Sequence, residues 1–226
     1  MTDCATSEAR ARQSLGISGG NPYYAWAVRG LEEDLPRATA ILDLGCGVGH
    51  FGKFLQDHFG QRPHGIDVIR HPGFLEESYA SFALHDLNAP LPTERSFDFI
   101  FALGLIEYIP NPRAFFHSVA PLLASGGRLV ITAPNPASLR SLLSLAVRGE
   151  FSAFRKSSNP ASITPVLPVD AQRMLREAHL PDPILEYSAS GRIPVCRELR
   201  YQQLLPFLRG RLWSDDFCCI ARSPVT

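Results

Sequence analysis

The residues best suited to binding a ligand lie in one short stretch of the sequence. Asp43 ends an apolar run, and Gly45, Gly47 and Gly49 follow at alternate positions before a helical pattern begins. Glycine lets the backbone turn tightly and approach a ligand closely, and the first turn of a helix offers unpaired N–H groups to an anionic group. The pattern therefore predicts a strand, a tight turn and a helix start, which is the local geometry of a nucleotide-binding βαβ unit.

The spacing of the three glycines separates the known classes of nucleotide loop. A dinucleotide-binding loop needs glycine at its first, third and sixth positions. Counting from Gly45, the sixth position is His50, because Gly49 comes one residue early. No Gly-Lys-Ser or Gly-Lys-Thr follows, so the stretch is not a P-loop either.

The segment from Asp43 to Gly49 resembles the signature loop of class I S-adenosylmethionine-dependent methyltransferases. In that family the loop wraps the methionine end of the cofactor, where there are no phosphates to bind. The resemblance covers most of residues 39–135 by motif and the remaining third of the chain by layout only. It implies that the chain binds S-adenosyl-L-methionine, transfers its methyl group and releases S-adenosyl-L-homocysteine.

A second acid, Asp67, lies near the carboxyl end of the next expected strand. It follows Gly45 by 22 residues, close to the spacing at which an acid meets the ribose hydroxyls in βαβ nucleotide sites. A carboxylate accepts two hydrogen bonds there and repels a phosphorylated sugar. An ordinary acid in a surface loop is the alternative, and the glycine loop upstream favours the ribose role.

Asp86 and Leu87 follow the third expected strand. In the family that the loop resembles, an acid at this point bonds the adenine amino group, and the next residue offers its N–H to the ring. A turn that Asp86 starts before Asn88 is the alternative. The complete set of predicted cofactor-binding residues is Asp43, Gly45, Cys46, Gly47, Gly49, Asp67, Val68, Asp86, Leu87 and Leu103.

In the family that the loop resembles, the reaction takes place beside the stretch that corresponds to residues 105–109. Members usually have a Leu-Glu-His-Leu type of sequence there, and this chain has Tyr108 in the histidine position. Tyrosine has an ordinary pKa of about 10 and is a poor base at neutral pH, so deprotonation of the acceptor by histidine is not expected. Glu107 and Tyr108 are the predicted catalytic residues. Glu107 acts as a base or orients the acceptor, and a structural role at a helix start is an equal alternative.

The elements that position these residues alternate between strands and helices. Apolar runs predict strands at 39–44, 64–68, 81–87, 96–103, 128–133, 184–188 and 216–221. Helical patterns predict helices at 21–35, 50–59, 112–123, 137–147, 169–178 and 197–208. The alternation predicts an α/β fold: a Rossmann-like, doubly wound sheet of about seven mostly parallel strands with helices on both faces.

The chain is predicted to form a single domain over residues 21–226, preceded by a flexible polar segment over residues 1–20. Residues 148–168 have little periodicity, as functional or disordered stretches do. Two phenylalanines supply apolar anchors, so this segment is a candidate lid on the acceptor side. In one subgroup of the family a histidine follows this insertion, whereas residues 162–165 here read Ser-Ile-Thr-Pro.

The charge balance indicates which kinds of partner the chain can bind. Acidic and basic residues number 22 each, and a neutral chain argues against nucleic acid as the main partner. Residues 1–136 carry 14 acidic and 10 basic residues, and residues 137–226 carry 8 and 12. Scattered solvated arginines explain the basic half better than an anionic acceptor does. No apolar stretch has transmembrane length, so no membrane partner is expected; the oligomeric state is not predicted.

The number and spacing of the cysteines indicate whether the chain forms disulfides or binds a metal. Five of them, Cys4, Cys46, Cys196, Cys218 and Cys219, are dispersed without a CxxC spacing. An odd, scattered set argues against a disulfide framework or a zinc site, and no other cluster of ligands suggests a metal. Reduced thiols predict a cytoplasmic protein.

The leading hypothesis is methyl transfer from S-adenosylmethionine to a small-molecule acceptor through an oxygen, nitrogen or carbon atom. The candidate lid and the lack of a basic nucleic-acid face motivate this substrate class. A non-catalytic binding module that kept the cofactor fold is the first alternative, because fold does not fix function. An NAD(P)-dependent oxidoreductase is a weaker one, because His50 occupies the position of its third glycine.

Overall fold

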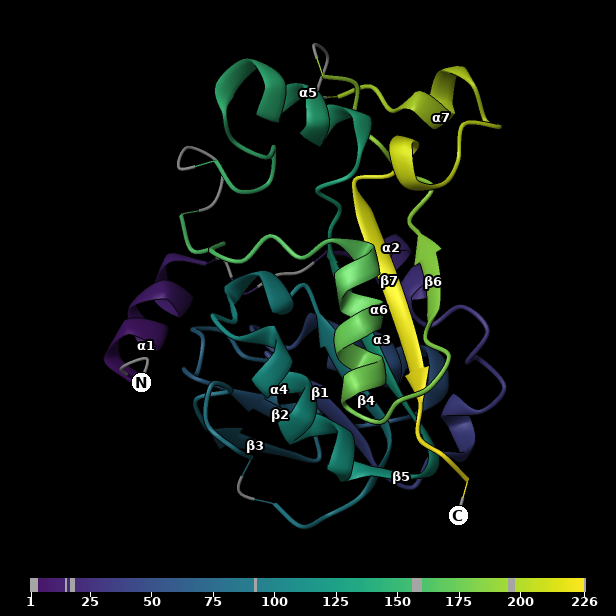
Figure 1. Ribbon diagram of the computed structural model, residues 1–226. Coiled ribbons are helices and arrows are strands. Elements are labelled where there is room, and N and C mark those ends of the chain that lie inside the picture. Colours follow the sequence, from purple (N-terminus) through teal and green to yellow (C-terminus); the bar gives the residue numbers. More distant parts are fainter. Residues whose placement is uncertain are drawn as a thin grey trace.

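The computed structural model describes residues 4–14, 16, 19–91, 93–155, 160–194 and 198–225. In this part the chain forms a seven-stranded sheet with the order β3-β2-β1-β4-β5-β7-β6 (Figure 1). The strands are β1 Ile41–Leu44, β2 His64–Asp67, β3 Ser81–Leu84, β4 Phe97–Leu103, β5 Leu123–Pro134, β6 Ile184–Tyr187 and β7 Asp216–Arg222. The first five run parallel, and β7 runs antiparallel to β5 and β6. The predicted mostly parallel sheet is confirmed.

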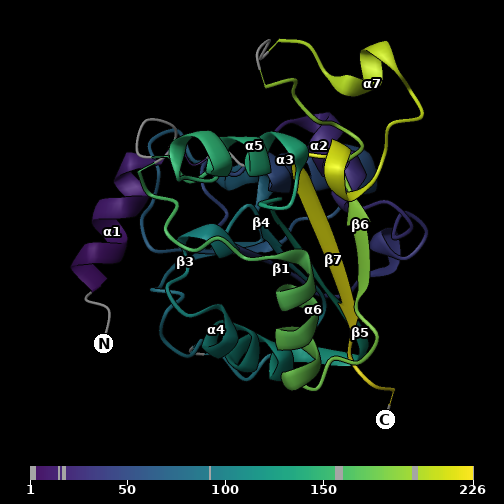
Figure 2. The ribbon, with the colours of Figure 1, turned by 45° about the horizontal axis from the view of Figure 1, so that its top comes forward.

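Helices cover both faces of the sheet, as predicted. Helices α2 (Asn21–Ala27) and α3 (His50–Phe59) pack apolar side chains against one face, and α4 (Pro112–Val119) and α6 (Pro168–Glu177) pack against the other. Short 3-10 helices are η1 Leu35–Arg37, η2 Glu76–Ser78, η3 Ile106–Tyr108, η4 Ala120–Leu122 and η5 Arg211–Trp213. Helices α5 (Leu139–Arg148) and α7 (Tyr201–Leu204) lie beyond the carboxyl ends of the parallel strands (Figures 1 and 2).

The strand order reverses at β1, because β2 pairs with one side of β1 and β4 pairs with the other. Open α/β sheets bind ligands outside the carboxyl ends of the strands at such a point. Strand β4 is apolar along almost its whole length and buried on both faces, as a central parallel strand must be. The fold therefore brings Asp43, Asp67 and Leu103, near the ends of β1, β2 and β4, to one edge of the sheet.

Three predicted helices are shorter than expected. The helix expected at 197–208 is the single turn α7, because Pro206 lacks an N–H donor and holds Leu205 in an extended conformation with φ −137°. The helix expected at 21–35 ends at Ala27, and the chain turns at Gly30, where φ is +76°. The helix expected at 112–123 gives way to η4 after Val119, because Pro121 interrupts it.

The first twenty residues contain structure that the sequence did not predict. Helix α1 (Cys4–Gln13) lies within the expected flexible segment and stands at the side of the sheet that carries β3 and β2 (Figure 1). Asn88 Nδ2 donates a hydrogen bond to Ser7 Oγ at 3.0 Å, which ties α1 to the turn after β3. Flexibility of this segment and the domain limits stay predictions. No helix in the described residues is both long and apolar enough to cross a membrane.

Candidate active site

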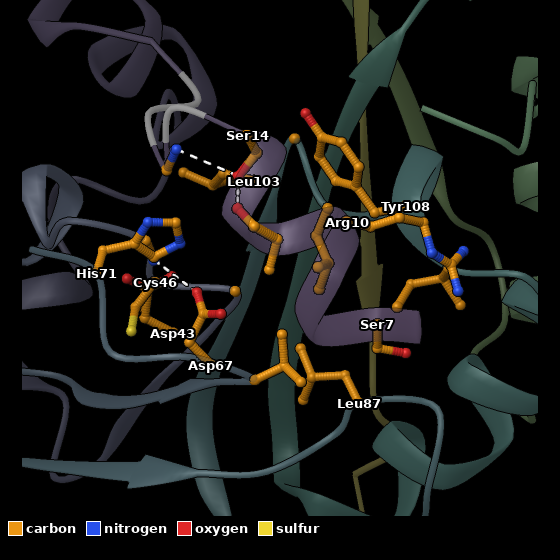
Figure 3. A pocket seen from close by; sticks show the side chains of 18 of the residues that line it. Ser7, Arg10, Ser14, Asp43, Cys46, Asp67, His71, Leu87, Leu103 and Tyr108 are labelled. Carbon is orange, nitrogen blue, oxygen red and sulfur yellow. Dashed lines mark hydrogen bonds between the residues drawn. The ribbon is translucent and has the colours of Figure 1, made fainter. Parts of the chain in front are cut away.

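A cavity of about 280 Å³ opens at the carboxyl ends of β1, β2 and β4. Figure 3 shows side chains from these strand ends and from α1 around it. Ten of the residues predicted to bind cofactor or acceptor line it: Asp43, Gly45, Cys46, Gly47, Asp67, Val68, Asp86, Leu87, Leu103 and Tyr108. Gly49 and Glu107 are not among the lining residues. The structure thus gathers most of the predicted set around one space.

The glycine loop adopts a conformation that requires its glycines. Gly45, Gly47 and Gly49 have φ values of +71°, +55° and +91°, which side-chain-bearing residues rarely adopt. A Cβ on Gly47 would lie 2.0 Å from the carbonyl oxygen of Gly16, so the loop also needs glycine for close packing. Gly49 directly precedes α3 as its N-cap and serves the loop's shape without lining the cavity.

Every N–H group of the loop from residue 45 to residue 49 has an acceptor within the protein. Ile66 O accepts from Gly45 and Cys46, Asp67 Oδ2 from Gly47, Gly16 O from Val48, and Cys46 O from Gly49, at 2.8 to 3.3 Å. A phosphate-binding loop works by leaving such N–H groups free for the phosphate oxygens. This loop therefore lacks the donors that a pyrophosphate would need.

Asp67 is 7 % exposed and holds the loop while lining the cavity. Its Oδ2 accepts the Gly47 N–H at 2.8 Å. Burial raises the pKa of this carboxyl, and the Gly47 hydrogen bond and the nearby His71 act in the opposite direction. The acid is thus fixed between β2 and the glycine loop.

Asp43 has a partner that sequence reasoning missed. Tyr79 donates its hydroxyl hydrogen to Asp43 Oδ2 at 2.6 Å, and the Tyr79 oxygen accepts the Gly52 N–H at 3.1 Å. Burial raises the pKa of Asp43 to about 7, against the effect of the Tyr79 hydrogen bond. Gly52 in a helix and Gly65 in a strand indicate a close approach by some group, without identifying it: a Cβ at either would lie 2.2 or 2.9 Å from the Tyr79 ring.

Asp86 starts the turn that was the alternative interpretation of it, and it also lines the cavity. Its Oδ1 accepts hydrogen bonds from the N–H and the Nδ2 of Asn88, at 3.0 and 2.7 Å, so it does start a turn. It also lines the cavity beside Leu87, which is 6 % exposed. The turn therefore aims this stretch at the cavity, and α1 covers it through the Asn88–Ser7 contact.

Helix α1 contributes polar groups that sequence reasoning did not predict. Ser7, Arg10 and Gln13 of this helix and Ser14 directly after it line the cavity, and Figure 3 shows α1 crossing it. The polar composition that suggested flexibility is also what a helix facing a polar ligand needs. No signal in the sequence alone distinguished the two.

Tyr108 and Glu107 are neighbours in η3 with different surroundings. Tyr108 lines the cavity, whereas Glu107 is 6 % exposed and lies outside the lining. Glu107 Oε2 has no hydrogen-bond partner among the described residues. Burial, with a smaller contribution from nearby Asp216, raises the pKa of Glu107 to about 8. At neutral pH the Glu107 carboxyl is therefore largely protonated, as a hydrogen-bond donor and not a base.

The candidate lid segment is joined to η3 at its far end. The N–H groups of Ile163 and Thr164 donate to the Glu107 carbonyl at 2.8 and 3.0 Å, and Thr164 Oγ1 donates to the Ile109 carbonyl at 2.7 Å. Pro160 lines the cavity from the same segment. The Ser-Ile-Thr-Pro sequence, which lacks the histidine of the subgroup, thus holds η3 and the residue after it through backbone N–H groups and a threonine hydroxyl.

The described residues contain no group of His, Cys, Asp or Glu that is arranged to hold a metal ion. Cys46, Cys218 and Cys219 are free and buried. Cys196 lies outside the described residues, as does the side chain of Cys4. Burial raises the pKa of the Cys46 thiol far above its ordinary value, so this residue stays a thiol at the cavity wall.

Comparison with known proteins gives one family. A family model described as a methyltransferase domain matches residues 23–204. Phosphoethanolamine N-methyltransferase 2 of Caenorhabditis elegans is 26% identical over 107 residues, which cover 44% of this chain and 24% of that protein. A ubiquinone biosynthesis O-methyltransferase of Xylella fastidiosa is 32% identical over 104 residues, 42% of each chain. The chain thus spans less than half the length of these relatives.

Solved structures share the whole fold at low sequence identity. A SAM-dependent methyltransferase from Archaeoglobus fulgidus superposes with a TM-score of 0.65 at 18% identity, covering 91% of this chain and 95% of the other. The Burkholderia thailandensis 1,6-didemethyltoxoflavin-N1-methyltransferase, solved with S-adenosylhomocysteine bound, gives a TM-score of 0.54 at 18% identity, covering 88% of this chain and 78% of the other. At these identities the likeness establishes the fold alone.

Proposed function

The chain belongs to the family of methyltransferase domains, and from this premise we propose that it transfers the methyl group of S-adenosyl-L-methionine to a small-molecule acceptor. The product would be S-adenosyl-L-homocysteine. Relatives named as N-methyltransferases and O-methyltransferases of small molecules support this class. We propose that the acceptor is a small molecule, and we do not assign its acceptor atom, which is oxygen, nitrogen or carbon.

The single observation that carries the proposal is the fully bonded glycine loop. The loop offers no free N–H between residues 45 and 49, and Asp43 and Asp67 stand next to it. Both features disfavour a phosphate. A sulfonium ligand that brings adenosine and a positive charge suits the same acids. The dinucleotide alternative is weakened by the loop's bonding as well as by its spacing.

The residues of the cavity divide between the two parts of the donor. When bound, the donor would supply a methyl group on a positively charged sulfur. We assign Asp67 to the ribose hydroxyls and Asp86 with Leu87 to the adenine, at the positions where the family has them. The glycine loop and Cys46 would then face the methionine part. Leu103, 4 % exposed at the end of β4, would close the apolar wall beside it.

The acceptor side is assigned to η3 and the segments that cover it. An in-line displacement gains mainly from positioning the acceptor and excluding water. Tyr108 lines the cavity and is proposed to contact the acceptor. Glu107, buried behind it with an unpartnered oxygen, is proposed to position η3 and the acceptor as a protonated acid. Helix α1 and Pro160 would exclude water from the reacting atoms.

Two further expectations stay proposals. We infer a cytoplasmic location from Cys46, Cys218 and Cys219, three free thiols in the described part of the chain. The lack of a nucleic-acid partner rests on the balanced charge, 22 acidic against 22 basic residues.

Two measurements test the proposal in order. Calorimetric titration with S-adenosylhomocysteine should give binding at or below tens of micromolar, and folded protein that does not bind it would refute the cofactor assignment. Transfer of a labelled methyl group to a panel of phenols, amines and carbon acids then tests the activity. Cofactor binding without turnover on a broad panel would favour the non-catalytic alternative.

A further inference from the structure

Helix α5 turns its apolar face away from the protein. Of its ten residues only Ser141 is buried, and Leu142, Leu143, Leu145 and Val147 are exposed, Val147 by 80 %. With 3.6 residues per turn, most of the leucines and the valine lie on one broad side and Ser141 lies on the other. A surface helix of a globular protein normally has the opposite orientation. The apolar side of α5 is therefore exposed and is not covered by other described residues of the chain.

The inward side of α5 is polar, and its bonds fix the orientation. Ser141 Oγ accepts the Ser152 N–H at 3.2 Å, and Ser144 Oγ donates to the Glu150 carbonyl at 2.8 Å. Arg140, whose side chain is 12 % exposed, pairs with Asp215 at 3.6 Å. The Ser141 and Arg140 contacts are largely buried, so the helix cannot rotate its leucines inward without breaking them.

A second exposed apolar segment lies at the same end of the molecule. Figures 1 and 2 both show α7 beyond the carboxyl ends of the parallel strands, at the same end as α5. The 3-10 helix η5 contacts α5. Nine of the fifteen exposed large apolar side chains in the described residues belong to these two segments. We call them the apolar cap: Leu142, Leu143, Leu145, Val147, Leu199, Leu204, Leu205, Phe207 and Leu212.

The charges around the apolar cap are mostly positive. Exposed bases within or beside its segments are Arg148, Arg192, Arg200, Arg209 and Arg211. Of these, Arg192 is paired with Asp215 at 2.6 Å. Exposed acids there are Glu150 and Glu198. A face that joins leucines and phenylalanine to surrounding arginines has the composition of an interfacial membrane-binding surface. Exposed arginines next to apolar groups in the chain are complementary to a layer of anionic headgroups over acyl chains.

We propose that the apolar cap docks the protein on the surface of a membrane that contains anionic lipid. The leucines, the valine and Phe207 enter the boundary between headgroups and acyl chains, and the arginines contact the headgroups. A second copy of the chain fits less well, because a symmetric interface would bring the same arginines together. This inference rests on the surface alone and does not depend on methyl transfer.

Surface docking would revise the sequence-based expectation of no membrane partner. That expectation used the lack of a stretch of transmembrane length, and an interfacial helix needs no such length. The apolar cap lies at the end of the sheet where the strands carry their carboxyl ends (Figure 1), the end at which the cavity also opens. Docking would thus hold that end of the molecule toward the lipid.

Cosedimentation of the full chain with vesicles tests the proposal. One set is phosphatidylcholine alone, and the other is an equal mixture of phosphatidylcholine and phosphatidylglycerol. We expect binding to the mixed vesicles, weak binding to the neutral ones, and weakening with added salt. The double variant Leu143→Ser/Val147→Ser should bind the mixed vesicles at least about tenfold more weakly, and Arg148→Gln/Arg209→Gln should reduce the salt dependence together with binding.

Matched controls use exposed residues outside the apolar cap. Leu84→Ser/Ile184→Ser removes two apolar side chains that are 64 % and 60 % exposed, and Arg29→Gln/Arg37→Gln removes two exposed charges. Both should bind as the original chain does. Thermal unfolding checks that each variant is folded. If the serine variant of the apolar cap folds poorly, the arginine variants still test the proposal.

Three results would overturn the proposal. The first is no binding of the original chain to the mixed vesicles. The second is equal binding by the cap variants and their controls. The third is a dimer in analytical ultracentrifugation that Leu143→Ser/Val147→Ser dissociates while vesicle binding stays unchanged, which would make a second copy the occupant.

Discussion

Tyr79 donates its hydroxyl hydrogen to Asp43 Oδ2 across 2.6 Å, and through the same hydroxyl group Tyr79 connects β1 with α3. Asp43 lies in β1, Tyr79 directly follows η2, and the Tyr79 oxygen receives the N–H of Gly52 in α3. The carboxylate is 2 % exposed, so its hydrogen bond replaces water that burial has removed. Tyr79 therefore holds the acid of the glycine loop in place.

Tyr79→Phe should destabilise the protein by about 1–3 kcal/mol, because it leaves both Asp43 and the Gly52 N–H without this partner in a buried place. Urea unfolding measures the change. Tyr187→Phe, at a half-buried tyrosine of β6, is the control and should change the unfolding free energy by about 0.5 kcal/mol or less. Equal effects of the two substitutions would show that the hydrogen bonds of the Tyr79 hydroxyl do not contribute to the free energy of unfolding.

Gly52→Ala should also be destabilising, by about 1–3 kcal/mol, although alanine is the better helix former. The added Cβ would lie 2.2 Å from Tyr79 Cε2, so the ring must move. Urea unfolding of a double-mutant cycle separates the cause: in a Tyr79→Ala background the same substitution should cost much less. If Gly52→Ala destabilised the protein equally in that background, the contact with the Tyr79 ring would not be the cause.

The sequence predicted the fold well where a pattern has one physical solution. The apolar run of β4 and the loop from Asp43 to Gly49 each specify one local structure, and the alternation of strands and helices specifies the parallel sheet. The ends of elements were less accurate, because Pro121 and Pro206 end helices that the apolar pattern alone would continue.

Most of the strand-end residues named from the sequence line the cavity, whereas the long-range contacts behind them were missed. Asp67 and Asp86 follow strands at a known spacing, so their approach to the cavity could be expected. The Asp43–Tyr79 contact joins residues 36 positions apart, and no local pattern encodes it. The outward-facing leucines of α5 were also missed, because an amphipathic pattern shows that a helix has two faces and not which face the protein covers.

Stability should fall as pH rises from about 5 to about 8, because burial raises the pKa of Asp43 and Asp216 to about 7 and of Glu107 to about 8. In the unfolded chain these groups lose their protons near pH 4. The folded state therefore binds more protons across this range, and its advantage is lost as the pH passes the folded pKa values. His64, whose pKa is lowered by burial, acts oppositely in the lower part of the range.

Urea unfolding at the two ends of that range measures the slope. Glu107→Gln should reduce the loss of stability between them by about 1–3 kcal/mol, because glutamine has no charge to bury. Glu150→Gln, at an exposed acid, should leave the slope unchanged. A stability that rises with pH in this range would contradict the protonated state of Glu107.

Tyr108→Phe should lower the rate of methyl transfer by about tenfold while the affinity for S-adenosylhomocysteine stays within about twofold. The reason is that Tyr108 is assigned to the acceptor and not to the donor. Turnover with a labelled donor and calorimetric titration give the two quantities. A matched loss in donor affinity would assign Tyr108 to the cofactor instead.

Asp67→Ala should weaken binding of S-adenosylhomocysteine by more than about 1 kcal/mol, the scale of a lost hydrogen bond to a charged group. Calorimetric titration measures the change, and Asp57→Ala, at an exposed acid that pairs with Lys53, serves as the control. Unchanged affinity in the Asp67 variant would refute the ribose assignment.

The central claim is that the loop from Gly45 to Gly49 holds an adenosyl ligand without phosphates, and parallel titration of the full chain with S-adenosylhomocysteine and with NADH tests it most directly. Because each loop N–H already has an acceptor, we predict binding of S-adenosylhomocysteine at or below tens of micromolar and no binding of NADH in the same range. Binding of NADH without binding of S-adenosylhomocysteine would contradict the account.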